Sequence, residues 1–380
     1  MSTFSYAIKM AIILFPIVAL IFTIPYIIYQ YHKYGSISSY RSIIVYSFLL
    51  YLMTAYFLVI LPLPSIETVS QMTTPSYNLI PFHFISEILS LSSFSASDFA
   101  TYFPTLQNPS VYESLFNIIL TVPFGIYLHY YFEFDFKKTA FYAFCLTLFF
   151  ELTQLSGLYF IYPRGYRVFD VDDLILNTLG GIIGYFLAFI PLKILPTRKE
   201  IDEEAKEKAK SVSILKRSMT FLIDFFLYSI FLIATIYLVH KYLTNSFFLK
   251  IGIGILWTMF YYLILPNILK GRTLGMKFFH LKFYSDKKII WYRIVNYYFW
   301  KLFIYVFLPI FLLIIGYVLW KNNNISTTFF EYYEIVLAAL TLMMYLIALL
   351  KRIYGMPLSY EKISHMSIIS SMENLEKSQE

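Results

Sequence analysis

The sequence predicts an all-α, polytopic integral membrane protein with about nine transmembrane helices in two helical modules. The first observation is composition: 59% of the 380 residues are apolar, 21% are aromatic and only 14% are charged. Soluble domains have roughly 45–50% apolar and about 25% charged residues, so an ordinary soluble enzyme is excluded. The second observation is a series of long apolar runs. The third is the confinement of most lysines and arginines to alternate loops.

Nine apolar runs approach the roughly 20 residues that a helix needs to cross a bilayer. They lie at about 10–28, 42–62, 115–132, 139–160, 173–194, 218–239, 248–268, 299–320 and 333–350. The third run is short and is interrupted by Pro123 and Gly125. The first run follows Lys9 and has no small-x-small cleavage site after it, so we expect a retained helix and not a cleaved signal peptide.

The loop charges predict the orientation in the membrane. Lysine and arginine concentrate in segments 193–217 and 269–299, whereas segment 62–115 contains neither. Because cytoplasmic loops accumulate basic residues, the N-terminus is expected outside the cell and the C-terminus in the cytoplasm. The net charge of +7 is then explained by topology, and we expect the lipid bilayer, not nucleic acid, as partner.

A charged linker, 196–216, interrupts the apolar sequence and is expected to form a solvated cytoplasmic helix. It separates a membrane domain at 1–195 from a second membrane domain at 217–362. The remaining residues, 363–380, form a polar tail that is expected to be disordered from Ser364 onward. Segment 62–115 carries apolar patches between its prolines and is expected to lie on the outer membrane surface.

The first domain places polar side chains where lipid-facing sequence is expected. Glu151 and Gln154 are three residues apart in the fourth run and therefore share a helix face. A helix beginning near residue 170, at roughly 100° per residue, gathers five further residues on one stripe, with Asp172 pointing away. These five are Asp170, Asp173, Asn177, Gly180 and Gly184. The two glycines allow close helix packing, most simply against the fourth helix.

A buried carboxylate needs a partner, because ionisable groups in a span cost a few kcal/mol. If the fourth helix ends near Gly157, Arg164 or Arg167 can fold back towards Glu151. We therefore predict a polar pocket on the external side, built from Glu151, Gln154, Arg167, Asp170, Asp173 and Asn177. The alternative is that Glu151, Gln154 and Asn177 only join helices, while Arg167 and the two aspartates form a surface ion cluster.

These residues fall into a pattern that resembles the VanZ-like family over roughly residues 10–195. The pattern is Glu151-x-x-Gln154 followed by Arg167-x-x-Asp170-x-x-Asp173-x-x-x-Asn177-x-x-Gly180, with Asn78-Leu-Ile-Pro-Phe82 and a segment from Asn117 to Gly125 upstream. The resemblance implies an association with resistance to teicoplanin-type glycopeptide antibiotics. It does not imply a particular reaction.

The second half, roughly 214–355, is similar to the RDD domain. The similarity rests on Arg217 with Asp224 and on Gly271-Arg-Thr-Leu-Gly275; Asp286 is the candidate second aspartate. Arg217 and Asp224 are seven residues apart, so they share a helix face about 10 Å apart along its axis. Arg217 alone is interpreted as an anchor at the membrane interface. Some RDD domains are linked to ion transport.

Other chemistry leaves no pattern in the sequence. The single cysteine, Cys145, excludes an intrachain disulfide, the six histidines lack ligand spacing, and no dinucleotide- or ATP-binding loop is present. We expect no metal and no cofactor. The leading hypothesis is a bacterial cell-envelope protein whose pocket binds an envelope lipid precursor or lipoglycopeptide. The alternatives are an enzyme whose carboxylates act on a lipid-linked substrate, with or without a divalent cation on Asp170 and Asp173, and an ion or proton transporter using Asp224 and Glu151.

Overall fold

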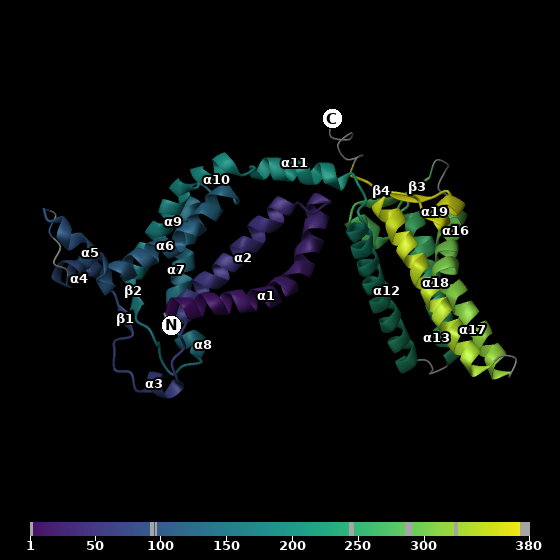
Figure 1. Cartoon of the computed structure of the whole chain (residues 1–380), viewed down its shortest axis with the longest axis horizontal. Coiled ribbons are helices and arrows are strands. Elements are labelled where there is room, and N and C mark those ends of the chain that lie inside the picture. Colours follow the sequence, from purple (N-terminus) through teal and green to yellow (C-terminus); the bar gives the residue numbers. More distant parts are fainter. Residues whose placement is uncertain are drawn as a thin grey trace. The chain divides into compact units, whose positions relative to one another are not determined.

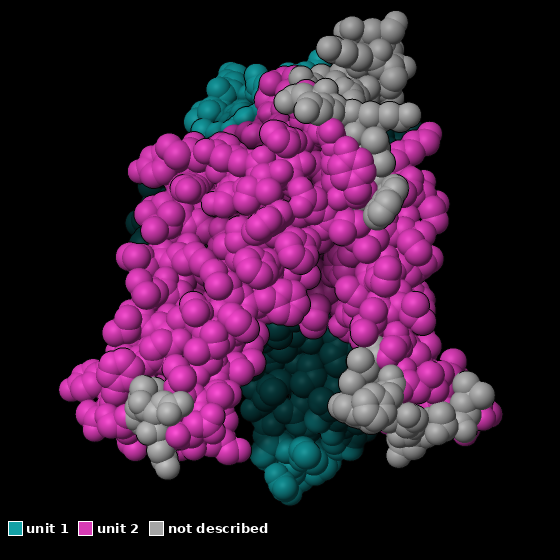
Figure 2. Space-filling view, turned by 90° about the vertical axis from the view of Figure 1, so that its right-hand side faces the viewer, with its two compact units in different colours: residues 1–26, 38–204 teal, residues 27–37, 205–380 magenta. Residues whose placement is uncertain are grey.

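The computed structural model (Figure 1) describes residues 3–91, 95, 97–242, 247–285, 291–322 and 326–372. The chain divides into two compact units, which are coloured separately in Figure 2. Unit 1 comprises residues 1–26 and 38–204, and unit 2 comprises residues 27–37 and 205–380. The described residues are mostly helical, with two short two-stranded sheets, which confirms the predicted all-α class.

Seven described helices are long and apolar enough to cross a membrane, so the chain is a multi-pass membrane protein. They are Phe4–Tyr34, Ser39–Ile60, Pro109–Tyr130, Val171–Ile194, Ile214–Tyr242, Tyr292–Lys321 and Thr327–Ile353. The other two predicted spans are also helical. Predicted span 139–160 becomes a 20-residue helix ending at Leu155, and 248–268 contains a shorter apolar helix, Gly252–Ile268.

The described part of unit 1 consists of helices and one two-stranded sheet. The elements, in order, are α1 (Thr3–Tyr34, continuing into unit 2), α2 (Ser39–Ile60), α3 (Ile66–Ser70), β1 (Tyr77–Asn78), α4 (His83–Leu91), η1 (Phe99–Thr101), α5 (Tyr102–Leu106), α6 (Pro109–Tyr130), α7 (Phe136–Leu155), α8 (Gly157–Phe160), β2 (Phe169–Asp170), α9 (Val171–Leu187), α10 (Phe189–Ile194) and α11 (Arg198–Ala209). Helix α9 packs closely against α6 and α7. Despite Pro123, α6 is a continuous helix.

Glycines determine how closely α9 approaches its neighbours. A Cβ at Gly180 would lie 2.1 Å from Ile118 O, and one at Gly184 would lie 2.1 Å from Val122 O, both in α6. The sequence predicted that these two glycines pack against the fourth span, which is α7. That prediction is wrong, because both glycines pack against α6. It is Gly181 that faces α7, where its Cβ would lie 2.4 Å from that of Ala143. Small residues on two sides let α9 pack between both neighbours.

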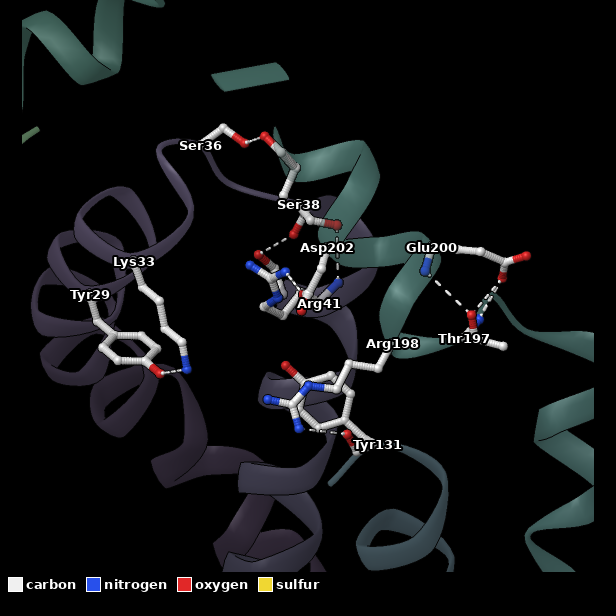
Figure 3. Close-up of polar contacts among 12 residues, drawn as sticks. Tyr29, Lys33, Ser36, Ser38, Arg41, Tyr131, Thr197, Arg198, Glu200 and Asp202 are labelled. Atoms are coloured by element: carbon white, nitrogen blue, oxygen red, sulfur yellow. Dashed lines mark hydrogen bonds and ion pairs between the residues drawn. The ribbon is translucent and has the colours of Figure 1, made fainter. Parts of the chain in front are cut away.

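The linker helix α11 is anchored by charge at its start. Arg41 of α2 is fully buried and pairs with Asp202 of α11, and Arg198 at the start of α11 donates to Tyr131 O over 3.5 Å (Figure 3). Ser38, close to Arg41, caps the N-terminus of α2. The prediction of a solvated helix holds for only part of its surface. Its positions 201, 205 and 209 are buried, because isoleucine and alanines recur every fourth residue on one face.

Unit 2 is a helical bundle with a small sheet at one end (Figure 1). Its elements are α12 (Ile214–Tyr242), α13 (Phe247–Met259), η2 (Phe260–Ile264), α14 (Leu265–Ile268), α15 (Leu274–Phe278), β3 (Leu281–Tyr284), α16 (Trp291–Leu302), η3 (Phe303–Phe307), α17 (Leu308–Lys321), α18 (Thr327–Ile353), α19 (Ser359–Ser364) and β4 (Ser367–Ser370). Strands β3 and β4 are antiparallel, with Leu281 opposite Ser370.

The disorder predicted from Ser364 onward is wrong for residues 367–370, which form β4. Ile368 packs against the apolar core beneath the sheet, as does the buried Met366 just before the strand. These apolar side chains explain why a short segment of a polar tail is ordered. Residues 373–380 lie outside the described part of the chain.

Candidate functional site

A cavity of about 650 Å³ opens in unit 1 between α4, α6, α7, α9 and the end of α2. All six residues of the predicted pocket line it: Glu151, Gln154, Arg167, Asp170, Asp173 and Asn177. Cavities that bind small molecules are usually roughly 300–1,000 Å³. The structure therefore brings the predicted residues together around a cavity whose volume is typical of small-molecule binding sites.

Glu151 and Gln154 reach the cavity from the last turns of α7, and both are buried. Helix α7 ends at Leu155, and after Ser156 the four residues 157–160 have positive φ angles. This left-handed turn reverses the chain and returns residues 169–170 to the helix. There Glu151 Oε2 accepts from Asp170 N at 3.0 Å, while Gln154 Nε2 donates to Val59 O at 2.9 Å.

Asp170 begins α9 and joins it to the segment before α4. Its side chain caps the helix by accepting from Asp172 N at 2.8 Å. Its other oxygen accepts from Asn78 Nδ2 at 3.1 Å, beside the parallel pairing of β1 and β2. The capping carboxylate is thus held between two segments about ninety residues apart in sequence.

Further along α9, Asp173 and Asn177 face the same cavity. Asp173 Oδ1 accepts from Asn117 Nδ2 of α6. Asn177 is 4% exposed, and Thr121 Oγ1 donates to its backbone carbonyl at 2.6 Å. Its side-chain Oδ1 is buried without a hydrogen-bond partner among the described residues. Buried polar atoms are rarely left unpaired, so this one requires an explanation.

Asp172 is a site residue that the helical periodicity missed. It also lines the cavity, but its carboxylate accepts from Phe82 N at 2.6 Å and Phe84 N at 2.9 Å. It thereby binds one backbone N–H just before α4 and one in its first turn, as a carboxylate at a helix N-terminus does. The resemblance did include Phe82, but periodicity along one helix could not reveal a partner from a distant segment.

The two arginines do not pair with Glu151, contrary to expectation. Arg167 lines the cavity and donates to Leu61 O at 3.0 Å. Arg164 donates instead to Met72 O, Thr74 O and Ser76 Oγ. Within the described residues, no lysine or arginine nitrogen lies within 4.0 Å of a carboxylate at the cavity wall. Both guanidinium groups reach carbonyl oxygens of the segment that follows α2 and therefore hold it in place.

Two tyrosines of the same returning loop also bind carbonyl oxygens around the end of α2. Tyr162 Oη donates to Pro64 O at 2.8 Å, and Tyr166 Oη donates to Ile60 O at 3.2 Å. Burial raises the pKa of Tyr166 to about 12, although neighbouring Arg167 acts in the opposite direction. Tyr166 is therefore a neutral hydrogen-bond donor at physiological pH.

In unit 2, Arg217 and Asp224 have different partners. Asp224 accepts from Tyr261 Oη, Thr273 Oγ1 and Gly275 N at 2.6–2.7 Å. The segment 271–275 thus closes over the carboxylate. Arg217 instead lies 3.4 Å from Glu361 Oε1 and donates to Ile368 O, so it joins the elements at the sheet end of the bundle. Asp286 lies outside the described residues.

Comparison with known proteins gives one match. The VanZ/LLP1 family model matches residues 48–193, less than half of the chain. No curated protein and no solved structure matches significantly. The matched segment contains all six predicted pocket residues and the helices that place them. The chain is therefore a multi-pass membrane protein with a segment similar to the VanZ/LLP1 family, and that segment carries the cavity.

Proposed function

We propose that this chain is a bacterial cell-envelope protein whose cavity binds an envelope lipid precursor or a lipoglycopeptide, and thereby lowers susceptibility to teicoplanin-type antibiotics. The observation that carries the proposal is the convergence of the six polar residues on one cavity inside the segment matched by the VanZ/LLP1 model. Their positions also support binding over simple helix adhesion, because no described residue pairs with the side-chain oxygen of Asn177 there.

Asp173→Asn is the direct test, because it removes one charge and preserves the side-chain size and the acceptor for Asn117. We expect the teicoplanin concentration that inhibits growth of an expressing strain to fall to the value of the strain without the protein. Glu67→Gln is the matched control, since Glu67 is exposed and lies away from the cavity. An unchanged inhibitory concentration for a well-expressed Asp173→Asn variant would refute the proposal.

The proposal includes an external cavity, with the N-terminus outside and the C-terminus in the cytoplasm. Its test uses a Cys145→Ser background with single cysteines in place of Glu67 or Lys208, both of which are exposed. We expect a membrane-impermeant maleimide to label position 67 in intact cells and position 208 only after permeabilisation. The reverse pattern would place the cavity on the cytoplasmic side.

We also propose that residues 214–355 form an RDD-like module in which Asp224 is structural. Support comes from its three hydrogen bonds, two of them to the segment 271–275 that carries the resemblance. Proton and sodium flux into vesicles containing the purified protein should then be the same for the native protein and Asp224→Asn. Flux that the substitution abolishes would instead favour the transporter alternative.

A further inference from the structure

The cavity wall carries far more negative than positive groups. Of the described residues that line it, Arg167 is the one lysine or arginine, and six carry carboxyl groups. These six are Glu87, Glu113, Glu151, Asp170, Asp172 and Asp173. His83 Nδ1 lies 3.5 Å from Glu87 Oε1 and balances one carboxylate only when it is protonated. The excess of negative charge therefore favours a cationic occupant.

The hydrogen bonds at the wall orient the carboxylates without neutralising them. Asp170, Asp172 and Asp173 accept from backbone N–H groups or from asparagine amides, and Glu151 accepts from a backbone N–H. All these donors are uncharged. Carboxylates held in this way in an apolar helical bundle retain a strong preference for an opposite charge nearby.

Asn177 provides a second and independent observation. It lies one helical turn beyond Asp173 on α9 and lines the same cavity, and its buried Oδ1 has no hydrogen-bond partner in the part of the chain that the structure describes. An unpaired acceptor is satisfied by a ligand that brings N–H or O–H donors. A phosphate group adds further acceptors and negative charge, so it would leave this atom unpaired.

We infer that the cavity binds its ligand through a protonated amino group, seated among Glu151, Asp173 and Asn177. This inference rests on the proposed function of the cavity as a binding site. An ammonium group offers three N–H donors and one positive charge, which match these acceptors. Phe4, Phe116 and Phe150 on the wall supply apolar surface for the carbon skeleton next to the ammonium.

A bound metal ion fits the wall less well. The described residues contain no group of three or more histidine, cysteine, aspartate and glutamate side chains arranged to hold a metal ion. The amino group can belong to a lipoglycopeptide or to an aminolipid headgroup, because both present an ammonium beside apolar groups. The chemistry at the wall is the same for the two sources.

Octylamine is the smallest probe of this chemistry, and octyl phosphate and N-octylacetamide are its anionic and neutral counterparts. Each is titrated calorimetrically into the full-length protein in a non-ionic detergent, and titration into empty micelles is subtracted. We expect saturable binding of octylamine, and no saturable binding of octyl phosphate or N-octylacetamide. Asp173→Asn and Glu151→Gln should each weaken it about tenfold, whereas Glu67→Gln should leave it unchanged. Teicoplanin and phosphatidylethanolamine then compete with octylamine, and the stronger competitor identifies the source.

Arg167→Gln tests the same inference in the opposite direction. Removal of the one permanent positive charge on the described wall should tighten octylamine binding, a gain that misfolding cannot produce. Equal binding of octylamine and octyl phosphate, or tighter binding of the phosphate, would overturn the inference. If octyl phosphate binds and Asp173→Asn still lowers resistance, the proposed function stands and the ligand class is wrong. If octylamine binds as expected and resistance does not change, the ligand class stands and the proposed function fails.

Discussion

Replacing Gly180 with alanine should loosen the contact between α6 and α9. The added Cβ would lie 2.1 Å from Ile118 O and 2.3 Å from Thr121 Oγ1. The first of these atoms belongs to the backbone of α6, so the helices must separate locally by about 1 Å to restore an ordinary contact. Overpacking of this kind costs about 1–3 kcal/mol, and alanine recovers about 1 kcal/mol of helix propensity. Because the clash is with backbone, the cost should lie in the upper half of this range, about 2–3 kcal/mol, and we expect a net loss of about 1–2 kcal/mol in unfolding free energy.

Cys145 offers a specific assay for this loss. It is the only cysteine in the chain, and it is half-buried in α7 of the same bundle. Its reaction with a thiol-reactive dye during heating should report a Tm roughly 2–8 °C below that of the native protein. Gly252→Ala is the matched control, since a Cβ there meets no atom within 4 Å. If both variants melt at the native temperature, the close contact between α6 and α9 does not exist.

Three further substitutions test other parts of the structure. Asp224→Ala leaves three donors without an acceptor and should destabilise unit 2 by about 2–4 kcal/mol. Tryptophan fluorescence during denaturation measures this loss, and an unfolding curve like that of the native protein would contradict the prediction. Arg164→Gln should release residues 72–76, measured as faster protease cleavage there; an unchanged cleavage rate would show that the guanidinium does not hold the segment. Burial lowers the pKa of His280, although its hydrogen bond to His32 O acts in the opposite direction. An unfolded histidine has a pKa of about 6.5, so the native protein should lose stability as the pH falls below that value. The His280→Gln variant should lose less stability over the same pH range, and equal losses would contradict the lowered pKa.

The candidate site could be predicted to the extent that it follows from one helix. A 100° rotation per residue places Asp170, Asp173 and Asn177 on one face without any tertiary information. The spacing of Glu151 and Gln154 works in the same way. These residues line one cavity because the polar face of α7 and the polar face of α9 lie side by side, and the left-handed turn after α7 brings the two faces together.

Partners from distant segments could not be predicted in this way. Asp172 binds the start of α4, about ninety residues earlier in the chain, and Arg217 pairs with Glu361, which is 144 residues away. Gly180 and Gly184 were expected to pack against α7 because it is the preceding helix, but the backbone of α6 approaches them instead. Sequence shows that a small residue allows close packing, but it does not show which helix takes the space.

Two buried polar centres, one in each unit, differ in how completely their hydrogen-bonding groups are satisfied, and this difference supports the roles proposed for them. Asp224 accepts three hydrogen bonds, and its pairing leaves little for a ligand to add. Among the described residues at the cavity of unit 1, Asp173 accepts one side-chain hydrogen bond and Asn177 Oδ1 accepts none. Polar groups that the fold satisfies stabilise it, whereas groups left unsatisfied beside an open space lower their free energy by binding. Substitution of Asp224 should therefore affect stability first, and substitution of Asp173 should affect ligand binding first.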